Sequence, residues 1–190
     1  MAMVGRSLLL LLLLVTLAAG HGVVVVVAFD PNPLQDFCVA DPTRRYGFTA
    51  RSVDIPGLNT LGASAARVDV APGGVFPPHY HPRASETAVV LVGAVYFGFV
   101  TSYPDSRVVA KVLRRGDVFA VPQGLVHFLH NNGSEPAALY ASLSSQNPGL
   151  VLVADALLAA PLPVDLVAKT LLTDEATVDK IRANFIVHRS

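Results

Sequence analysis

The sequence contains a single cysteine, no tryptophan and few charged residues. The low charge argues against a nucleic-acid partner, and the single cysteine excludes an intrachain disulfide. Lysine and arginine together number 14, as do aspartate and glutamate, so the formal net charge is zero. No basic cluster is larger than Arg114-Arg115, which is too small to follow a phosphate backbone, so we expect no nucleic-acid partner. Because Cys38 is alone, no disulfide can form within the chain.

Residues 1–28 have the features of a secretory signal peptide. Arg6 precedes an unbroken apolar run at 8–14, and small residues follow at 17–20. Cleavage fits after Gly20 or after Ala28. Before the second point, Val26 and Ala28 occupy the positions that a signal peptidase reads. We favour Ala28, because the mature chain would then begin just before Asp30, as in the sequences that this one resembles.

A membrane anchor is the alternative interpretation of this region. Residues 8–29 are long enough to span a bilayer, and His21 is the only strongly polar interruption. No later segment is apolar over a comparable length. After cleavage we therefore expect a secreted chain of about 160 residues, with no stable membrane span and enough length to bury one core.

The middle of the chain predicts an all-β domain. Apolar and β-branched residues cluster between glycine and proline turns at 65–70, 87–92, 94–101, 107–113, 117–121, 126–130, 137–142 and 150–153. Many short strands without a helical period favour an antiparallel sandwich or barrel, and a jelly roll accommodates this number.

Beyond Pro163 the apolar residues recur at helical spacing, which predicts C-terminal helices at about 163–187. Thr173 followed by Asp174 and Glu175 predicts the cap and the acidic first turn of the last helix. We therefore expect one domain over 29–190, with its barrel at about 58–158.

Three histidines and one glutamate are spaced so that they can close on one metal ion. The segment P-G-G-V-F-P-P-H-Y-H-P-R-A-S-E supplies His79, His81 and Glu86, and G-D-V-F-A-V-P-Q-G-L-V-H-F-L-H-N supplies His127. On a strand, His79 and His81 project to the same side, about 7 Å apart at the backbone. Two imidazoles at that separation can converge on one ion.

The other two residues must reach this ion through turns. Glu86 has the opposite parity, so a turn or bulge near Pro82 must reset the register. His127 follows a Pro-x-Gly turn and must come from a different strand. His130 is out of phase with His127 and is predicted to be a surface or supporting residue.

The combination of residue types favours a metal site over separate structural histidines. A single histidine in a β-rich chain is more often a hydrogen-bonded structural residue than a ligand. Three imidazoles with one carboxylate are nevertheless a set that first-row divalent metals prefer, and ligand type alone does not separate manganese from iron, nickel or zinc. His21 and His188 belong to no such pattern.

These segments resemble the two signature boxes of the germin and germin-like proteins in the cupin superfamily. Gly73 to Gly93 fits the first box and Gly116 to Asn131 the second, both without a gap, and 31–41, 59–62 and 145–149 are also similar to the family. The resemblance implies a cupin jelly-roll barrel with manganese bound by His79, His81, Glu86 and His127. It also implies homo-oligomers, in which dimers assemble into a hexamer.

Two activities are associated with this family, oxalate oxidase and superoxide dismutase. Oxalate oxidases of the family carry asparagines at the positions of Phe76 and Ala66. An apolar ring and a methyl group cannot hold a carboxylate, so oxalate oxidation is disfavoured and superoxide dismutation is retained. The resemblance also implies an apoplastic location and a role in plant defence. The alternative is a non-catalytic, metal-stabilised cell-wall or ligand-binding protein.

The chain departs from the family pattern near its N-terminus. Germin-like proteins usually pair the cysteine at position 38 with a second one downstream, but residues 41–52 contain none and the region before the first strand is short. Cys38 is thus either free or bridged to another chain. The sequon Asn132-Gly133-Ser134 predicts a glycan on Asn132 in a polar turn.

Overall fold

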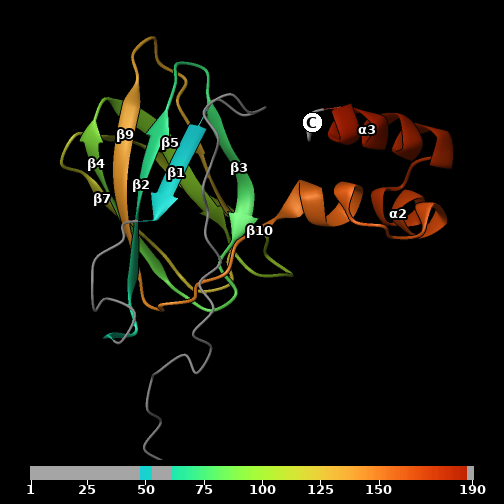
Figure 1. Ribbon diagram of the computed structural model, residues 1–190, viewed down its shortest axis with the longest axis horizontal. Coiled ribbons are helices and arrows are strands. Elements are labelled where there is room, and N and C mark those ends of the chain that lie inside the picture. The colour runs from blue at the N-terminus through green and yellow to red at the C-terminus, as the bar shows by residue number, and fades with distance from the viewer. Residues whose placement is uncertain (1–47, 53–60, 188–190) are drawn as a thin grey trace, which may run out of the picture.

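Two antiparallel five-stranded sheets form the body of the protein, seen in the computed structural model of Figure 1. The structure describes residues 48–52 and 61–187. The predicted signal peptide at 1–28, Cys38 and His188 lie outside the described residues.

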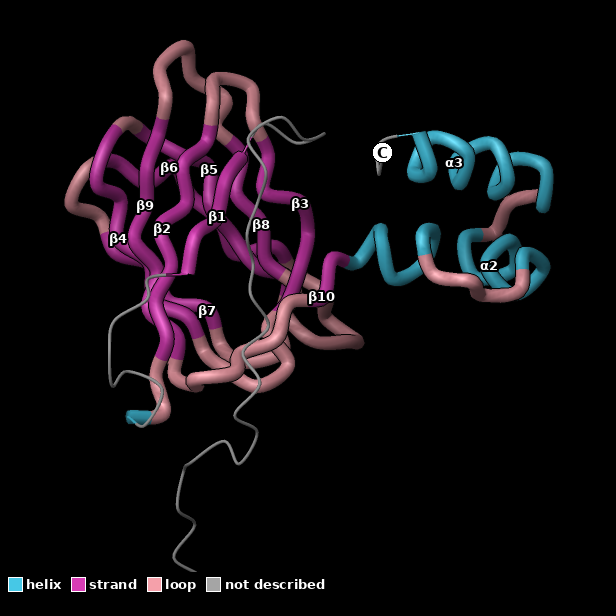
Figure 2. The backbone as a smooth tube through the Cα atoms, viewed as in Figure 1, coloured by secondary structure: helices cyan, strands magenta, loops and turns pink. Residues whose placement is uncertain are grey.

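The first sheet has the strand order β1-β2-β9-β4-β7. Its strands are β1 (Phe48–Ser52), β2 (Ser64–Val70), β9 (Ala137–Leu143), β4 (Glu86–Val92) and β7 (Val118–Val121). The second sheet has the order β10-β3-β8-β5-β6. Its strands are β10 (Val151–Leu152), β3 (Val75–Tyr80), β8 (His127–His130), β5 (Ala94–Val100) and β6 (Val108–Arg114). Consecutive strands therefore often belong to opposite sheets, as Figure 2 shows, and the all-β cupin jelly roll is confirmed.

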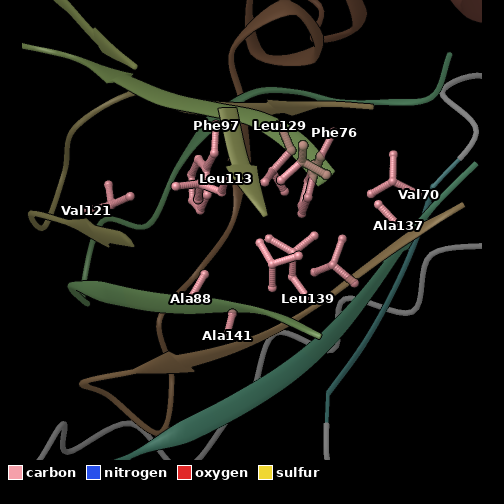
Figure 3. Packing of buried hydrophobic residues seen from close by; sticks show 13 residues of the cluster. Val70, Phe76, Ala88, Phe97, Leu113, Val121, Leu129, Ala137, Leu139 and Ala141 are labelled. Carbon is pink, nitrogen blue, oxygen red and sulfur yellow. The ribbon is translucent and has the colours of Figure 1, made fainter. Parts of the chain in front are cut away.

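The hydrophobic core lies between the inner faces of the two sheets. Figure 3 shows Phe97 and Leu129 of the second sheet pointing toward Leu139 and Ala88 of the first. The period-2 alternation of the strands produces this layer, because every second side chain faces inward. Burial of each large apolar side chain contributes about 1.5–3 kcal/mol, so this layer holds the sheets at a fixed separation.

The structure differs from the sequence-based expectation most at the two ends of the barrel. β1 lies upstream of the predicted barrel start near residue 58 and pairs along its whole length with β2. β10 has only two residues, and a π-helical turn, η2 (Asp155–Ala159), follows within a few residues. The apolar run at 150–153 gave no means to distinguish a short strand from the start of a helix.

The cap of the last helix is Asp174, not Thr173 as predicted. The Asp174 carboxylate accepts hydrogen bonds from the backbone N–H and the hydroxyl of Thr177, both at 2.8 Å, which satisfies a free donor in the first turn of α3 (Glu175–Val187). The N–H of Thr173 instead donates to the carbonyl of Ala168 and closes the preceding helix, α2 (Val164–Leu171).

The C-terminal helices stand beside the sheets and extend away from them next to β10 (Figure 1). Val167, Ala168 and Val178 form a small core of their own, separate from the core between the sheets. The helices α2 and α3 pack mainly against each other, and α3 also packs against η2. Within residues 48–52 and 61–187, no helix is both long and apolar enough to cross a membrane.

Gly98 is required by the close approach of β5 and β6. A Cβ atom at this position would lie 2.2 Å from the Cβ of Ala110 and 2.8 Å from the carbonyl oxygen of Val109. We expect Gly98→Ala to lower the unfolding free energy by about 1–3 kcal/mol through overpacking. Denaturant unfolding should show this. Gly133→Ala is the control, because its new Cβ would have Asn131 Oδ1 at 3.3 Å as its nearest neighbour. Equal stability of the two variants would contradict the prediction.

Candidate metal centre

His79 and His127 lie opposite each other on neighbouring strands of the second sheet. β3 and β8 pair in a register that puts these two residues side by side, with ring centroids 4.1 Å apart. The register of β3 shifts between Phe76 and His79. Pro77 and Pro78 fall at this irregularity and have no N–H to give to the ladder, which explains why the pairing breaks there.

His81 and Glu86 are joined by a turn that carries the chain from one sheet to the other. His81 follows the last residue of β3, and Glu86 is the first residue of β4, where it pairs with Val121 and Leu143. The predicted break near Pro82 is therefore present. It does more than reset the register, because it places the carboxylate on the sheet that faces the histidines.

The four predicted ligands form one buried group. One ligand atom from each of His79, His81, Glu86 and His127 lies within 4.8 Å of those of the other three. The residues are 1%, 9%, 8% and 1% exposed, respectively. Oε2 of Glu86 is 3.0 Å from Nε2 of His81 and 3.2 Å from Nε2 of His127.

Backbone carbonyls fix the tautomer of all three histidines. Nδ1 of His79 lies 2.8 Å from the carbonyl oxygen of Pro77, and Nδ1 of His127 lies 2.9 Å from that of Leu125. Nδ1 of His81 contacts the carbonyl oxygen of Gly149. Because a carbonyl can only accept, each Nδ1 carries the proton, and each neutral ring keeps the lone pair on Nε2.

This arrangement fits a bound cation. With the proton on Nδ1, a neutral ring turns its Nε2 lone pair toward the Glu86 carboxylate oxygen, which lies at hydrogen-bond distance from Nε2 of both His81 and His127. A positive charge between these atoms removes the repulsion, either a proton on Nε2 that hydrogen-bonds to the carboxylate or a bound metal ion. Imidazoles oriented by a hydrogen bond at the opposite nitrogen are the usual form of metal-ligating histidines.

The electrostatics of the group act on the protonation of Glu86 and of His79. Burial alone would raise the pKa of Glu86, but contacts with His127 and His81 outweigh it and hold the pKa of this carboxyl below its usual range. Burial, reinforced by the neighbouring His127, lowers the pKa of His79 well below its ordinary value, and the opposing attraction of Glu86 is weaker. Near neutral pH, Glu86 is thus a carboxylate and His79 is a neutral donor.

Phe76 and Ala66 occupy different positions relative to this group. Phe76 is buried, and its ring stacks on the imidazole of His79, with centroids 3.9 Å apart and planes 12° from parallel. Ala66 pairs with Ala141 on β9, which in turn pairs with Ala88 on β4. The residue in the Phe76 position therefore supports a ligand ring directly.

The remaining predicted residues lie outside the group. His130 is half-buried and pairs with Val75 and Tyr96, in agreement with its predicted phase. Asn132 is exposed in the turn between β8 and β9. The carbonyls that orient the histidines could not be predicted, because a backbone acceptor has no residue type to recognise. It also did not single out Arg83 and Asn147, which contact each other beside the turn from His81 to Glu86.

Comparison with known proteins agrees with the fold and shows the family. The cupin family profile matches residues 39–179. Germin-like protein 5-1 from Oryza sativa subsp. japonica is 82% identical over 230 aligned positions, which cover all of both chains. This chain has 190 residues, so at least 40 of the 230 aligned positions are gaps in this chain. Germin-like protein 8-2 of rice is 40% identical over 225 positions, covering 97% of this chain and 100% of that protein.

Solved structures give the same result. An oxalate oxidase structure, solved to study the mechanism of that enzyme, is 37% identical to this chain. The two superpose with a TM-score of 0.73 over 77% of this chain and 76% of that one. Oxalate decarboxylase from Bacillus subtilis at pH 4.6, with a TM-score of 0.63 and 22% identity over 72% of this chain and 35% of that one, shares the fold. The chain belongs to the germin-like proteins of the cupin superfamily.

Proposed function

We propose that this chain is a secreted, manganese-binding germin-like protein of the apoplast, with superoxide dismutase activity and a role in plant defence. One observation carries the proposal: three histidines, each with its Nδ1 against a backbone carbonyl, converge with Glu86 on a common point. His79, His81, Glu86 and His127 would hold the ion. We propose manganese because the family resemblance implies it, and because imidazole and carboxylate ligands are compatible with this ion.

The bound metal would supply one-electron redox chemistry at coordination positions that four protein ligands leave open. The chain would supply the geometry and the charge. The neutral imidazoles donate lone pairs, and the Glu86 carboxylate neutralises part of the ion's charge inside a largely buried site. Phe76 keeps the His79 ring in place by stacking.

We propose that oxalate is not a substrate, although a structurally similar protein is an oxalate oxidase. A dianion beside the metal needs hydrogen-bond donors, since desolvating its charge without partners is unfavourable. Phe76 presents a ring and Ala66 a methyl group. Neither side chain can donate.

A second candidate function is a non-catalytic cell-wall or ligand-binding protein that uses metal for stability. The burial of all four ligands supports it, because an ion that binds only the folded state stabilises that state by linkage. Metal-dependent stability without turnover would favour this candidate over the enzyme.

Secretion, glycosylation and self-association are part of the same proposal. The signal-peptide pattern at 1–28 and the exposed position of Asn132 support a secreted glycoprotein. The helices support self-association into dimers and a hexamer, because they stand away from the sheets and expose Leu166, Leu171 and Leu172 at 50%, 41% and 93%. Exposed apolar residues that lie together commonly mark a protein–protein contact.

We expect the mature protein from a secretory host to contain near-stoichiometric manganese and to dismutate superoxide, with no oxidation of oxalate. His79→Ala and His127→Ala should each lose the metal and the activity, because each removes a ligand. Elemental analysis and a superoxide assay measure both.

His130→Ala is the matched control, since it removes a histidine from the same strand as His127 but outside the ligand group. It should retain metal and activity. Bound metal without turnover would shift the assignment to the binding protein, and a folded chain without metal would refute the site.

The metal-free protein should lose stability on acidification from pH 6.5, the ordinary pKa of histidine. The pKa of folded His79 lies well below this value, so below it the unfolded chain binds more protons. One extra proton bound by the unfolded chain lowers the unfolding free energy by up to about 1.4 kcal/mol for each pH unit of acidification. The pKa of Glu86 is also lowered in the folded state, so this residue acts in the same direction at more acidic pH.

Thermal melts of chelator-treated protein from about pH 7.5 to 5.5 measure this slope. The slope should become shallower in His79→Gln and stay unchanged in His130→Gln. An unchanged slope in His79→Gln would rule out His79 as its source.

Light scattering after size-exclusion chromatography should show wild-type oligomers, and Leu166→Glu/Leu172→Glu should reduce their mass by placing charge on the exposed apolar residues. Lys169→Glu introduces the same side chain on α2 at a position that is already charged, and should leave the mass unchanged. A monomeric wild-type protein would contradict the proposal.

A further inference from the structure

A short connection between β9 and β10 runs alongside the metal centre. We call residues 144–149 the strap and residues 81–85 the ligand turn. Leu143, just before the strap, pairs with Glu86, and Leu152, three residues beyond its end, pairs with His79. The strap thus links the strands that flank ligands on both sheets.

The strap is hydrogen-bonded to the ligand turn along its length. The N–H of Ser144 donates to the carbonyl of Ser85 at 3.1 Å, and the N–H of Ser85 donates to the hydroxyl of Ser144 at 3.0 Å. The N–H of Arg83 donates to the carbonyl of Pro148 at 3.1 Å. The turn that separates His81 from Glu86 is therefore shaped by residues about 60 positions later in the chain.

The Arg83 side chain adds a two-point clamp on the strap. Its Nε donates to the backbone carbonyl of Asn147 and its Nη2 to the Asn147 side-chain oxygen, both at 2.7 Å. Asn147 is almost completely buried, and its N–H donates to the hydroxyl of Ser145. Charge-assisted bonds in this forked geometry are stronger than neutral ones and fix direction as well as distance.

The far end of the strap touches a ligand directly. The carbonyl of Gly149 accepts the Nδ1 proton of His81. Gly149 has φ +67°, and a Cβ atom there would lie 2.8 Å from Cγ of Pro82 and 3.0 Å from Nη2 of Arg83. The strap backbone therefore lies close against the turn, and the clamp is within two residues of the carbonyl that orients His81.

We propose that Arg83 is a positioning residue for the metal centre. By holding Asn147, it keeps the Gly149 carbonyl against Nδ1 of His81, which fixes the tautomer and the direction of the Nε2 lone pair. This inference rests on the proposed metal-binding function. Lysine cannot replace Arg83, because a single ammonium group lacks the planar fork that reaches both oxygens of Asn147.

The test compares Arg83→Met and Arg83→Lys with Arg107→Met. Arg107 is also an exposed arginine, but its ion pair is with Asp105 in the loop between β5 and β6. Manganese affinity is measured by chelator competition, and the unfolding temperature of the metal-free protein reports on the fold. Both Arg83 variants should bind manganese about 10- to 100-fold more weakly, as found when a partner that orients a ligand is removed. Arg107→Met should bind as the wild type does.

A second readout follows the His81 ring itself. Side-chain ¹⁵N NMR of the metal-free protein should show His81 protonated on Nδ1 in the wild type and in Arg107→Met. In Arg83→Met the two tautomers should be mixed. This measurement needs no metal, so it decides the role of Arg83 even if the wild type binds no manganese and the proposed function fails.

Asn147→Ala completes the design, because it removes one of the two acceptors of the clamp. If both residues act through the same contact, the double variant should lose little more affinity than Arg83→Met alone. Wild-type affinity in Arg83→Met, or an unchanged His81 tautomer in that variant, would overturn the proposal.

Discussion

The constraint on which this structure depends is the burial of one carboxylate among three imidazoles in the space between two sheets. The four side chains converge there and belong to residues that are at most 9% exposed, so little water can solvate them. A buried carboxylate is tolerated only with compensating partners. The sheets must therefore remain at the separation that the hydrophobic layer sets, and the ligands must reach the site from both sides.

Much of this could be predicted from the sequence. The alternation of apolar residues and the glycine and proline turns indicated an antiparallel β domain, and the spacing of His79, His81 and Glu86 implied a break near Pro82. The phase of His130 relative to His127 predicted that the two side chains face differently, and His130 lies outside the group of four candidate ligands. These predictions succeeded because they depend on local periodicity, which a single sequence records directly.

Other features could not be read from the residue types. That the turn at Pro82 crosses between sheets, and that Phe76 stacks on His79, follow from long-range pairing. The capping of α3 by Asp174 depended on which neighbouring N–H the preceding helix had already engaged. The strap shows the same limit: S-Q-N-P-G was noticed as family-like, but its role required knowing that it lies against the ligand turn.

The hydrogen bonds of the three histidines differ in how far along the chain they reach. His79 and His127 each contact a carbonyl two residues upstream, whereas the acceptor for His81 is 68 residues downstream. The rings of His79 and His127 are thus oriented by their own strands, and their direction depends on only a few consecutive residues. The third is oriented only when the polypeptide has closed on itself, so His81 is the candidate ligand whose direction depends on residues far along the chain, whereas the other two depend on their own strands.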